Sequence, residues 1–500
     1  MIEAYAPDQI RAAEERLGEE LRSGELMRRA ARGLAEVVMV RLEEREAGTV
    51  VGLVGPGNNG ADTLHALAHL AHSGINAAAV TLGASSQLDT AAPLVAGAVE
   101  AATAAGVLLH PAGSEGATAA LGEAEVVLDG IYGIGGRAGL PDDARDLVDA
   151  IDEDAFVIAV DVPSGQDPEG GSADPDAVWA DESVTFATPK PVHLLPATEA
   201  ATGRLTVVDI GLDLTGEAPV VRRLTRDDVA AHWPVPLASD DKYSRGVLGI
   251  VAGGEDYSGA AVLATTAAVS AGVGMVRYVG TPTPTALVRA AVPEAVHGDG
   301  RVQAWLIGPG LDVAATGEDA AAQLDIARAA LASDLPTVVD AGGLDLVEGP
   351  RDAPTLLTPH AGECARLLGR LRADADEPSA EDVTAHEWDA AGELADLTGA
   401  TVLLKGATTV VRMPGEVGGY SQAEAPAWLA TAGAGDVLAG LLGALLAGGV
   451  DPSVAGALGA LVHGVAAEDA NPGGPVRALA VAHALPSTVA GLLRRGLTAP

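Results

Sequence analysis

The chain has 500 residues, with 69 acidic and 30 basic side chains and a formal net charge of −39. This length exceeds the ~100–200 residues of one domain, so we expect at least two domains. The 48% apolar content excludes a disordered polyanion, the negative charge argues against nucleic-acid binding, and the single cysteine excludes a disulfide framework.

The first half of the chain alternates β-rich runs with helical stretches. Its amino terminus is acidic and lacks an apolar core, so no signal peptide is expected. Predicted strands span residues 49–54, 76–82, 125–129 and 156–160, and a helix is expected from Ala61. Continuous apolar strands separated by helices indicate an α/β fold with a parallel sheet covered on both faces.

The pattern breaks around residues 213–242, where prolines interrupt it, and we place a domain boundary near residue 220. This gives domains 1–220 and 221–500. In the second domain, strands are predicted at 247–251, 275–279, 305–307, 337–340 and 401–404. The longest apolar run, 437–450, suits a buried helix and is shorter than the ~20 residues that span a bilayer. We therefore expect a cytoplasmic protein without membrane segments.

Glycine-rich loops and acidic strand ends mark a first candidate site. The segment TVVGLVGPGNNGADTL carries a strand into a glycine loop and a helix start, an arrangement suited to a phosphate, although a plain tight turn gives the same pattern. Asp129 and Asp161 end two further strands, and GIYGIGGRAG follows Asp129. A lone strand-end aspartate is usually a turn former. Several such ends in one sheet indicate a ligand crevice at the strands' carboxyl ends.

The segment TAGAGD, residues 431–436, marks a second candidate site. Glycines before a buried helix expose backbone N–H groups that suit an anion, and Asp436 lies in the first helical turn. A carboxylate beside an anion hole suits phosphoryl transfer to a hydroxyl, whereas an ordinary capped helix is the alternative. His360, which follows a strand and Pro359, is either a ligand contact or a core histidine. The absence of a GxxxxGK[ST] pattern excludes a P-loop enzyme.

Residues 5–212 resemble the YjeF N-terminal domain, the NAD(P)H-hydrate epimerase family, in AYAPDQIRAAE, GPGNNGAD, DGIYGIGGRAGL, DVPSGQD and SVTFATPK. The resemblance implies a Rossmann-like fold that interconverts the R and S hydrates at nicotinamide C6. It implies Asp161 as the catalytic acid/base, and K⁺ held by Asn59, Asp129 and Ser164. The residues implied in substrate binding are Asn58, Asn59, Gly60, Ala61, Asp62, Gly133, Ile134, Gly135, Gly136, Arg137, Ala138, Gly139 and Asp161.

This chain departs from that family at one motif. The family commonly reads GGDG where the chain has Gly60-Ala61-Asp62-Thr63. If either substituted position needed a positive φ, the side chain would be strained and the epimerase weakened. Lys190, in the TPK segment, either reaches a phosphate or is a solvated charge at a strand end.

Residues 241–493 resemble the YjeF C-terminal domain, the ribokinase-like NAD(P)H-hydrate dehydratase family. The resemblance implies that a nucleotide phosphorylates the C6 hydroxyl of the S hydrate, that phosphate then leaves, and that Asp436 is the base. ADP is the expected co-substrate, with ATP possible, together with Mg²⁺. The implied substrate contacts are Ala260, Gly310, His360, Ala361, Gly362, Glu363, Arg366 and Asp436; the implied nucleotide contacts are Lys405, Gly406, Ala407, Thr408, Thr409, Gly433, Ala434 and Gly435.

Together the two resemblances imply a bifunctional enzyme that repairs hydrated NADH and NADPH (NADHX and NADPHX). An attached epimerase supplies the single epimer that the dehydratase accepts. The alternative is a ribokinase-like small-molecule kinase with a non-catalytic, dinucleotide-binding amino-terminal domain. The expected partners are these small molecules and further copies of the chain in a homo-oligomer.

Overall fold

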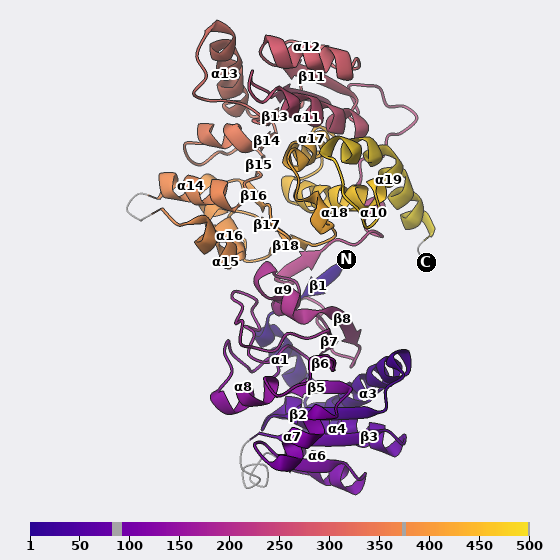
Figure 1. The fold of residues 1–500 in the computed structure, drawn as a ribbon. Helices are drawn as coiled ribbons and strands as arrows, with labels where there is room; N and C mark the ends of the chain where they lie inside the picture. The colour runs from indigo at the N-terminus through magenta and orange to yellow at the C-terminus, as the bar shows by residue number, and fades with distance from the viewer. Residues whose placement is uncertain (83–92, 373–376, 499–500) are drawn as a thin grey trace. The chain divides into compact units, whose positions relative to one another are not determined.

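The computed structural model describes the chain except for residues 83–92, 373–376 and 499–500. The chain divides into two compact units (Figure 1). The amino-terminal unit comprises Glu3–Val221, and the carboxyl-terminal unit comprises Arg222–Pro500 with Met1–Ile2.

The amino-terminal unit is built on a seven-stranded sheet in which every neighbouring pair of strands is parallel. The strand order is β4-β3-β2-β5-β6-β7-β8. The strands are β2 (Thr49–Val54), β3 (Asn76–Thr81), β4 (Leu108–Pro111), β5 (Val126–Gly130), β6 (Phe156–Val160), β7 (Glu182–Phe186) and β8 (Arg204–Val208). The order reverses direction between β2 and β5, and open α/β sheets bind ligands at such a switch point.

Helices cover both faces of this sheet. The neighbours Val50 and Val51 of β2 belong to separate clusters, because successive strand residues point to opposite faces. One cluster contains α3, α4 and α6, and the other contains α7 and α8. The elements are β1 (Ile2–Ala4), α1 (Pro7–Arg16), α2 (Glu19–Arg22), α3 (Glu25–Arg45), α4 (Asn58–His72), α6 (Pro93–Ala104), α7 (Glu115–Gly122), α8 (Asp142–Val148), η1 (Pro191–His193) and α9 (Pro196–Thr202).

The prediction that a helix begins near Ala61 is wrong by about one turn, since α4 begins at Asn58. Gly57 takes an extended conformation as the residue before the helix, so the glycine loop is shorter than expected. The asparagine pair therefore lies in the first helical turn. The prediction of an α/β fold with parallel strands is confirmed.

The carboxyl-terminal unit has a larger sheet, in the order β9-β18-β17-β16-β15-β14-β13-β10-β11-β12. The pairings from β12 to β16 are parallel, and β17 and β18 add antiparallel strands. The strands are β9 (Val221–Arg223), β10 (Val247–Val251), β11 (Met275–Val279), β12 (Val296–His297), β13 (Ala304–Ile307), β14 (Thr337–Val339), β15 (Thr355–Leu357), β16 (Thr401–Leu404), β17 (Thr409–Arg412) and β18 (Gly419–Gln422).

Helices α11, α17, α18 and α19 pack on one face of this sheet, and α13, α14 and α16 contribute to the clusters on the other. The predicted buried helix is α17. No helix in the described part of the chain is long and apolar enough to cross a bilayer. The elements are α10 (Val229–His232), α11 (Ser258–Ser270), α12 (Pro282–Ala291), α13 (Glu318–Leu331), η2 (Ala341–Leu346), α14 (Ala361–Leu371), α15 (Ala380–Ala385), α16 (Glu387–Thr398), η3 (Ala427–Leu429), α17 (Ala434–Ala447), α18 (Pro452–Ala470) and α19 (Ala478–Thr498).

Gly60 allows α4 to approach the end of β2 closely. A Cβ atom at Gly60 would collide with the carbonyl group of Gly55, which is backbone and has little room to move. We expect Gly60→Ala to lower the free energy of unfolding of the amino-terminal unit by about 1–3 kcal/mol. Gly97→Ala in α6 is the control, because a Cβ there meets nothing within 4 Å. Chemical denaturation of both variants measures the difference, and equal stabilities would contradict this packing.

Candidate active sites

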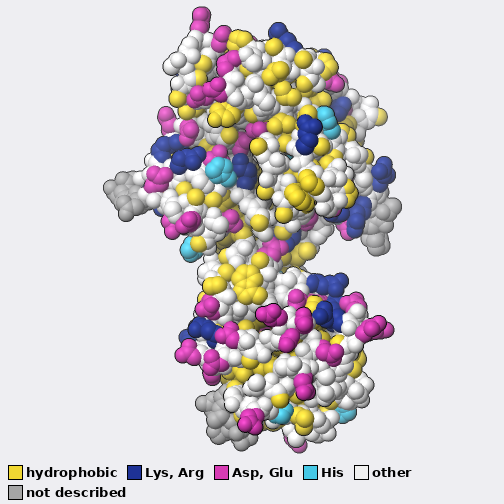
Figure 2. Space-filling model, in the orientation of Figure 1, with side chains coloured by type: hydrophobic (Ala, Val, Ile, Leu, Met, Phe, Trp, Pro, Cys, Tyr) yellow, Lys and Arg dark blue, Asp and Glu magenta, His cyan; other side chains and the backbone are white. Residues whose placement is uncertain are grey.

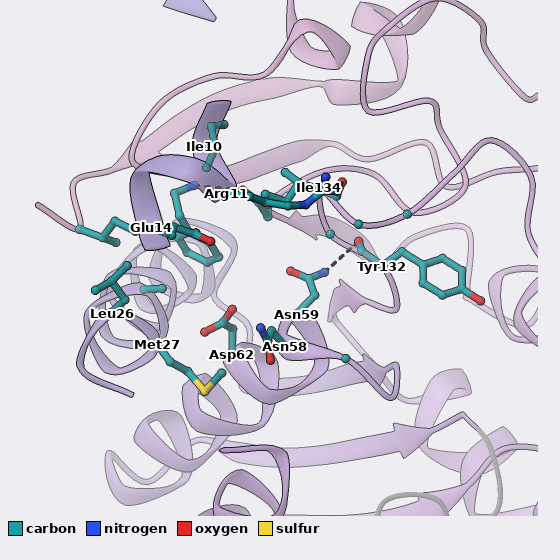
Figure 3. Close-up of a pocket in the computed structure, with 18 of the residues that line it drawn as sticks. Ile10, Arg11, Glu14, Leu26, Met27, Asn58, Asn59, Asp62, Tyr132 and Ile134 are labelled. Carbon is teal, nitrogen blue, oxygen red and sulfur yellow. Dashed lines mark hydrogen bonds between the residues drawn. The ribbon is translucent and has the colours of Figure 1, made fainter. Parts of the chain in front are cut away.

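A cavity of about 560 Å³ opens at the switch point of the amino-terminal unit (Figure 3). The loops after β2 and β5 form part of its wall, and α1 and α3 contribute the apolar side chains of Ile10, Leu26 and Met27. Of the predicted site residues, Asn58, Asn59, Asp62, Gly133, Ile134, Gly135, Gly136 and Asp161 line it. A pocket with an apolar lining and a few convergent polar groups is typical of a ligand site.

Five predicted residues are not part of this lining. Gly60 and Ala61 are buried within α4, and Arg137, Ala138 and Gly139 lie further along the loop after β5. The positive-φ concern does not apply, since Ala61 and Thr63 are helical and neither has a positive φ. Both side chains fit the structure without backbone strain.

Asp161 is held under strain at the end of β6. Its φ is 68°, in the left-handed region that few non-glycine residues adopt. One carboxylate oxygen, Oδ1, accepts hydrogen bonds from the Thr185 hydroxyl at 3.1 Å and from the Lys190 ammonium group. Strained backbone of this kind clusters at functional sites.

Lys190 is only 1% exposed and forms an ion pair with Asp161. The interpretation of Lys190 as a solvated charge at a strand end is therefore wrong. A contact with a phosphate stays a prediction, since Lys190 lines the cavity. Burial alone would raise the pKa of the Asp161 carboxyl, but the Lys190 ammonium and its hydrogen bond hold that pKa below its ordinary value. Asp161 is thus ionised at neutral pH.

His193 holds the backbone of Asp161 by a hydrogen bond. Its Nδ1 accepts the Lys190 backbone N–H at 2.9 Å, so Nε2 carries the proton and donates it to the Asp161 carbonyl, also at 2.9 Å. Burial lowers the pKa of His193 to about 3, with the Lys190 charge adding to the effect. The imidazole is neutral and fixes the backbone position of Asp161.

Further carboxyls line the same cavity, among them those of Glu14 on α1 and Asp62 on α4 (Figure 3). Burial raises the pKa of Asp62 well above its ordinary value, and the charges of Asp161 and Glu14 add to this effect. Burial also raises the pKa of Glu14, with Asp161 contributing. Glu14 was not predicted as a site residue, although it lies in the AYAPDQIRAAE segment.

Asp129, Ser164 and Asn59 meet around the loop after β5. Asp129 is fully buried and accepts backbone N–H groups from Ser164 at 2.7 Å and Ile131 at 3.3 Å. The Ser164 hydroxyl and the Asn59 amide both donate to the Tyr132 carbonyl, at 3.2 and 3.0 Å. This cluster of oxygen atoms lies beside the cavity wall.

The second candidate site lies at the carboxyl ends of parallel strands in the carboxyl-terminal unit. Asp340 follows β14, His360 follows β15 and Lys405 follows β16, and a parallel bridge joins His360 to Lys405. Gly310, after β13, has a φ of 64°, and a Cβ there would meet Ala260 at 2.8 Å. The structure therefore brings Gly310 and Ala260 together.

Lys405 forms ion pairs with carboxylates that follow two neighbouring strands. Its Nζ lies 2.8 Å from Oδ1 of Asp340 and 3.7 Å from Oε2 of Glu363. Burial would lower the pKa of Lys405, but Asp340, Glu363 and Asp436 raise it above its ordinary value. The lysine is thus a charged group surrounded by carboxylates.

Asp340 was missed from the sequence as a site residue. It is 2% exposed and also accepts the Thr358 hydroxyl at 2.8 Å. The signal was available, because Asp340 ends an apolar strand in the same way as Asp129 and Asp161. Ala341 beside it has a φ of 45°, so the backbone is strained here as it is at Asp161.

Asp436 occupies the first turn of α17, after Gly433, whose φ is 87°. The pKa of Asp436 is raised to about 7, chiefly by burial and also by the Asp340 charge, with the Lys405 charge opposing both. A Cβ on Gly435 would lie 3.6 Å from Nζ of Lys405, so the glycine turn and the lysine are close. A carboxyl that titrates near neutral pH suits a general base.

His360 is an exposed helix cap rather than a core histidine. Its Nδ1 accepts the backbone N–H groups of Gly362 and Glu363 at 3.1 and 3.3 Å, and Glu363 caps in return. Ala361 and Arg366 lie on the same helix, α14. Gly406, Ala407 and Thr408 form the turn after Lys405, and Thr409 begins β17.

The surplus negative charge lies on the molecular surface. Figure 2 shows acidic side chains spread over the visible face of the amino-terminal unit, with fewer Lys and Arg among them. Solvated carboxylates are screened within about 8–10 Å, so they do not set the potential inside a cavity. The charged groups inside each site do so, the carboxyls as well as Lys190 and Lys405.

Comparisons with known proteins agree with two functional units. A family model described as NAD(P)H-hydrate dehydratase matches residues 248–484, and one described as YjeF-related protein N-terminus matches residues 23–192. The chain is 44% identical to the bifunctional NAD(P)H-hydrate repair enzyme of Mycobacterium tuberculosis over 470 residues, 91% of each chain. It is 40% identical to the enzyme of the same name from Mycobacterium leprae, over 93% of each chain.

Among solved structures, the ADP/ATP-dependent NAD(P)H-hydrate dehydratase of Bacillus subtilis, co-crystallised with ATP and Mg²⁺, is 26% identical. It aligns with 55% of this chain and 100% of its own, with a TM-score of 0.48.

Proposed function

The chain belongs to the family of bifunctional NAD(P)H-hydrate repair enzymes, and we propose that its two units perform the two successive reactions of that repair. The amino-terminal unit interconverts the R and S epimers of NADHX and NADPHX. The carboxyl-terminal unit dehydrates the S epimer at the expense of ADP, with ATP as a possible substitute. The observation that carries the proposal is the presence, in each unit, of a carboxyl with a shifted pKa: Asp161 at the end of β6, and Asp436 in the first turn of α17, near Lys405.

In the amino-terminal unit, the ionised Asp161 exchanges a proton with the water or hydroxyl at C6 and stabilises the cationic ring formed when the hydroxyl leaves. Lys190 keeps Asp161 ionised, and His193 holds its backbone. The loop from Gly133 to Gly139 and the first turn of α4 bind the dinucleotide, since a helix amino terminus favours phosphate.

In the carboxyl-terminal unit, Asp436 removes the proton of the C6 hydroxyl while that oxygen attacks the terminal phosphoryl group of the nucleotide. The N–H groups at the start of α17 and the Lys405 ammonium stabilise the developing phosphate charge. Phosphate then departs from C6, assisted by the ring nitrogen, because phosphate is a much better leaving group than hydroxide. Residues 405–409 and 433–435 bind the nucleotide, and residues 360–366 with Ala260 and Gly310 bind the hydrate.

Mg²⁺ would enter with the nucleotide. Among the described residues, no group of three or more His, Cys, Asp or Glu side chains is placed to hold a metal ion. Mg²⁺ commonly binds through substrate phosphates and water rather than through a protein cage. It would neutralise phosphate charge during transfer.

The decisive experiment supplies mixed R and S hydrate to the full chain with ADP, with ATP or with no nucleotide, and follows the absorbance of the reduced nicotinamide. We expect complete recovery with nucleotide and none without it. Recovery of only the S fraction would refute the epimerase. Nucleotide turnover that is independent of hydrate would instead support a small-molecule kinase.

We further propose that K⁺ binds beside the cavity, with ligands from Asn59, Asp129 and Ser164. The fit rests on the buried Asp129 carboxylate, which is stabilised by Ser164 and by the Ile131 N–H group and pairs with no cationic side chain among the described residues. A buried charge of this kind is costly without a counterion. We expect K⁺, compared with choline at equal ionic strength, to raise the melting temperature of the amino-terminal unit by about 2–4 °C. Asp129→Asn should abolish this shift, and an equal shift in that variant would contradict the site.

A further inference from the structure

Epimerisation at C6 requires proton transfer on both faces of the nicotinamide ring. The hydroxyl leaves one face as water, and water returns to the opposite face. A single carboxylate that lies against one face serves only one of these transfers well. The proposed epimerase function, on which this inference rests, therefore requires a second acid/base group in the cavity.

Asp62 is placed to be that group. It is the fifth residue of α4 and lines the cavity, and its Oδ1 atom is buried with no hydrogen-bond partner among the described residues. Figure 3 shows the carboxyls of Asp62 and Glu14 turned toward each other across the hollow. Buried polar atoms are nearly always satisfied, so an unsatisfied one in a ligand cavity indicates a ligand contact.

The cavity brings together an ionised carboxyl and a carboxyl that favours its protonated form. Asp161 is paired with Lys190 and ionised, whereas no described residue forms an ion pair with Asp62, and burial together with its acidic neighbours favours its protonated form. The charged groups that line the cavity are Arg11, Glu14, Glu15, Asp62, Asp161 and Lys190. Pairs of carboxyls whose surroundings separate their pKa values are typical of an acid and a base that work together.

We propose that Asp62 is a second catalytic residue of the epimerase and donates a proton to the C6 hydroxyl on the ring face opposite Asp161. The C6–O bond breaks as Asp62 protonates the hydroxyl, which leaves as water, and the nitrogen lone pair forms a C=N bond. Water then adds to the other face while Asp161 accepts its proton. Asp62 regains a proton and Asp161 loses one through solvent, and the reverse conversion retraces the same steps.

Glu14 is the competing candidate. It lies on α1, which Arg11 ties to the loop after β5 through a 2.7 Å hydrogen bond to the Ile134 carbonyl. The Lys190 charge lowers the pKa of Glu14 and so opposes its protonation. No cation is among the groups that shift the pKa of Asp62. Glu14 therefore acts indirectly, because its charge raises the pKa of Asp62. Replacement of Glu14 should lower epimerisation less than replacement of Asp62.

The test follows conversion of purified R-NADPHX to the S epimer by chromatography, with the full chain and no nucleotide, so that dehydration does not consume the product. We expect Asp62→Asn to lower kcat/KM at least about 100-fold, the lower range for loss of a general acid. Glu14→Gln should lower it less than about 10-fold. Asp142→Asn, a control at a carboxyl with a fully exposed side chain, should leave it unchanged.

The pH profile separates an acid from a structural residue. The wild type should lose activity at alkaline pH as Asp62 ionises. Asp62→Glu should show the same loss of activity at a shifted pH, and the residual activity of Asp62→Asn should show no such alkaline limb. In oxygen-18-labelled water each conversion should incorporate one labelled oxygen. An unreactive wild type would refute the proposed epimerase. A wild type that converts the epimers while Asp62→Asn keeps its rate, or keeps the alkaline limb, would overturn the role of Asp62.

Discussion

Replacement of Asp436 by Asn should abolish dehydration of S-NADPHX, lowering kcat by about 10²–10⁴-fold, the range for loss of a general base. Asparagine has nearly the same shape and preserves the first turn of α17, but it cannot accept the hydroxyl proton. Nucleotide binding should change little, because the N–H groups of Gly433–Gly435 and the Lys405 ammonium remain. The measurements are single-turnover dehydration with ADP or ATP and nucleotide affinity by calorimetry.

The pH dependence provides an independent check of Asp436 as the base. Its pKa is about 7, and a base acts only when ionised, so dehydration should rise with pH through neutrality and then level. Asp340→Asn removes a charge that raises this pKa and frees Lys405 to lower it, so the rise should move to lower pH. Loss of nucleotide binding in Asp436→Asn, or an unmoved profile in Asp340→Asn, would contradict these roles.

The sequence predicts several strands near both sites well because these strands are buried and continuously apolar, whereas the buried but more polar β7 is not predicted. Five predicted strands, β2, β6, β10, β11 and β16, have the observed bounds. The less apolar strands β4 and β8 were not predicted from periodicity, since exposed residues interrupt their apolar runs. Apolar runs report burial, and burial is what a single sequence reveals most directly.

Site residues that depend on partners far along the chain were harder to predict. Lys190 looks like a surface charge in sequence, and its role appears only when β6 and the segment after β7 lie together and place it against Asp161. Glu14 and Asp340 are likewise identified as site residues only by their partners in space. Glu14 lies near enough to Asp161 for that charge to raise its pKa, and Asp340 forms an ion pair with Lys405. Long-range electrostatic pairing has no local sequence signature, whereas a glycine loop between a strand and a helix does.

Replacement of Asp161 by Asn should abolish epimerisation, by about 10²–10⁴-fold, without changing dehydration of pure S hydrate. Asparagine tolerates the left-handed conformation at φ 68° better than most residues, so the backbone should persist. The variant also leaves the Lys190 ammonium buried without its partner. Loss of one member of a buried ion pair costs about 3–5 kcal/mol, so the amino-terminal unit should melt earlier.

This instability could itself explain a loss of epimerisation, and the double variant Asp161→Asn/Lys190→Met separates the two causes. Removal of both charges leaves no unpaired ion in the interior, and such replacements are often neutral for stability. The double variant should therefore recover much of the melting temperature while its epimerisation remains absent. If activity returned together with stability, Asp161 would be a structural residue. If neither returned, the strained end of β6 would itself depend on the ion pair, and Lys190→Met alone should then unfold the unit to the same extent.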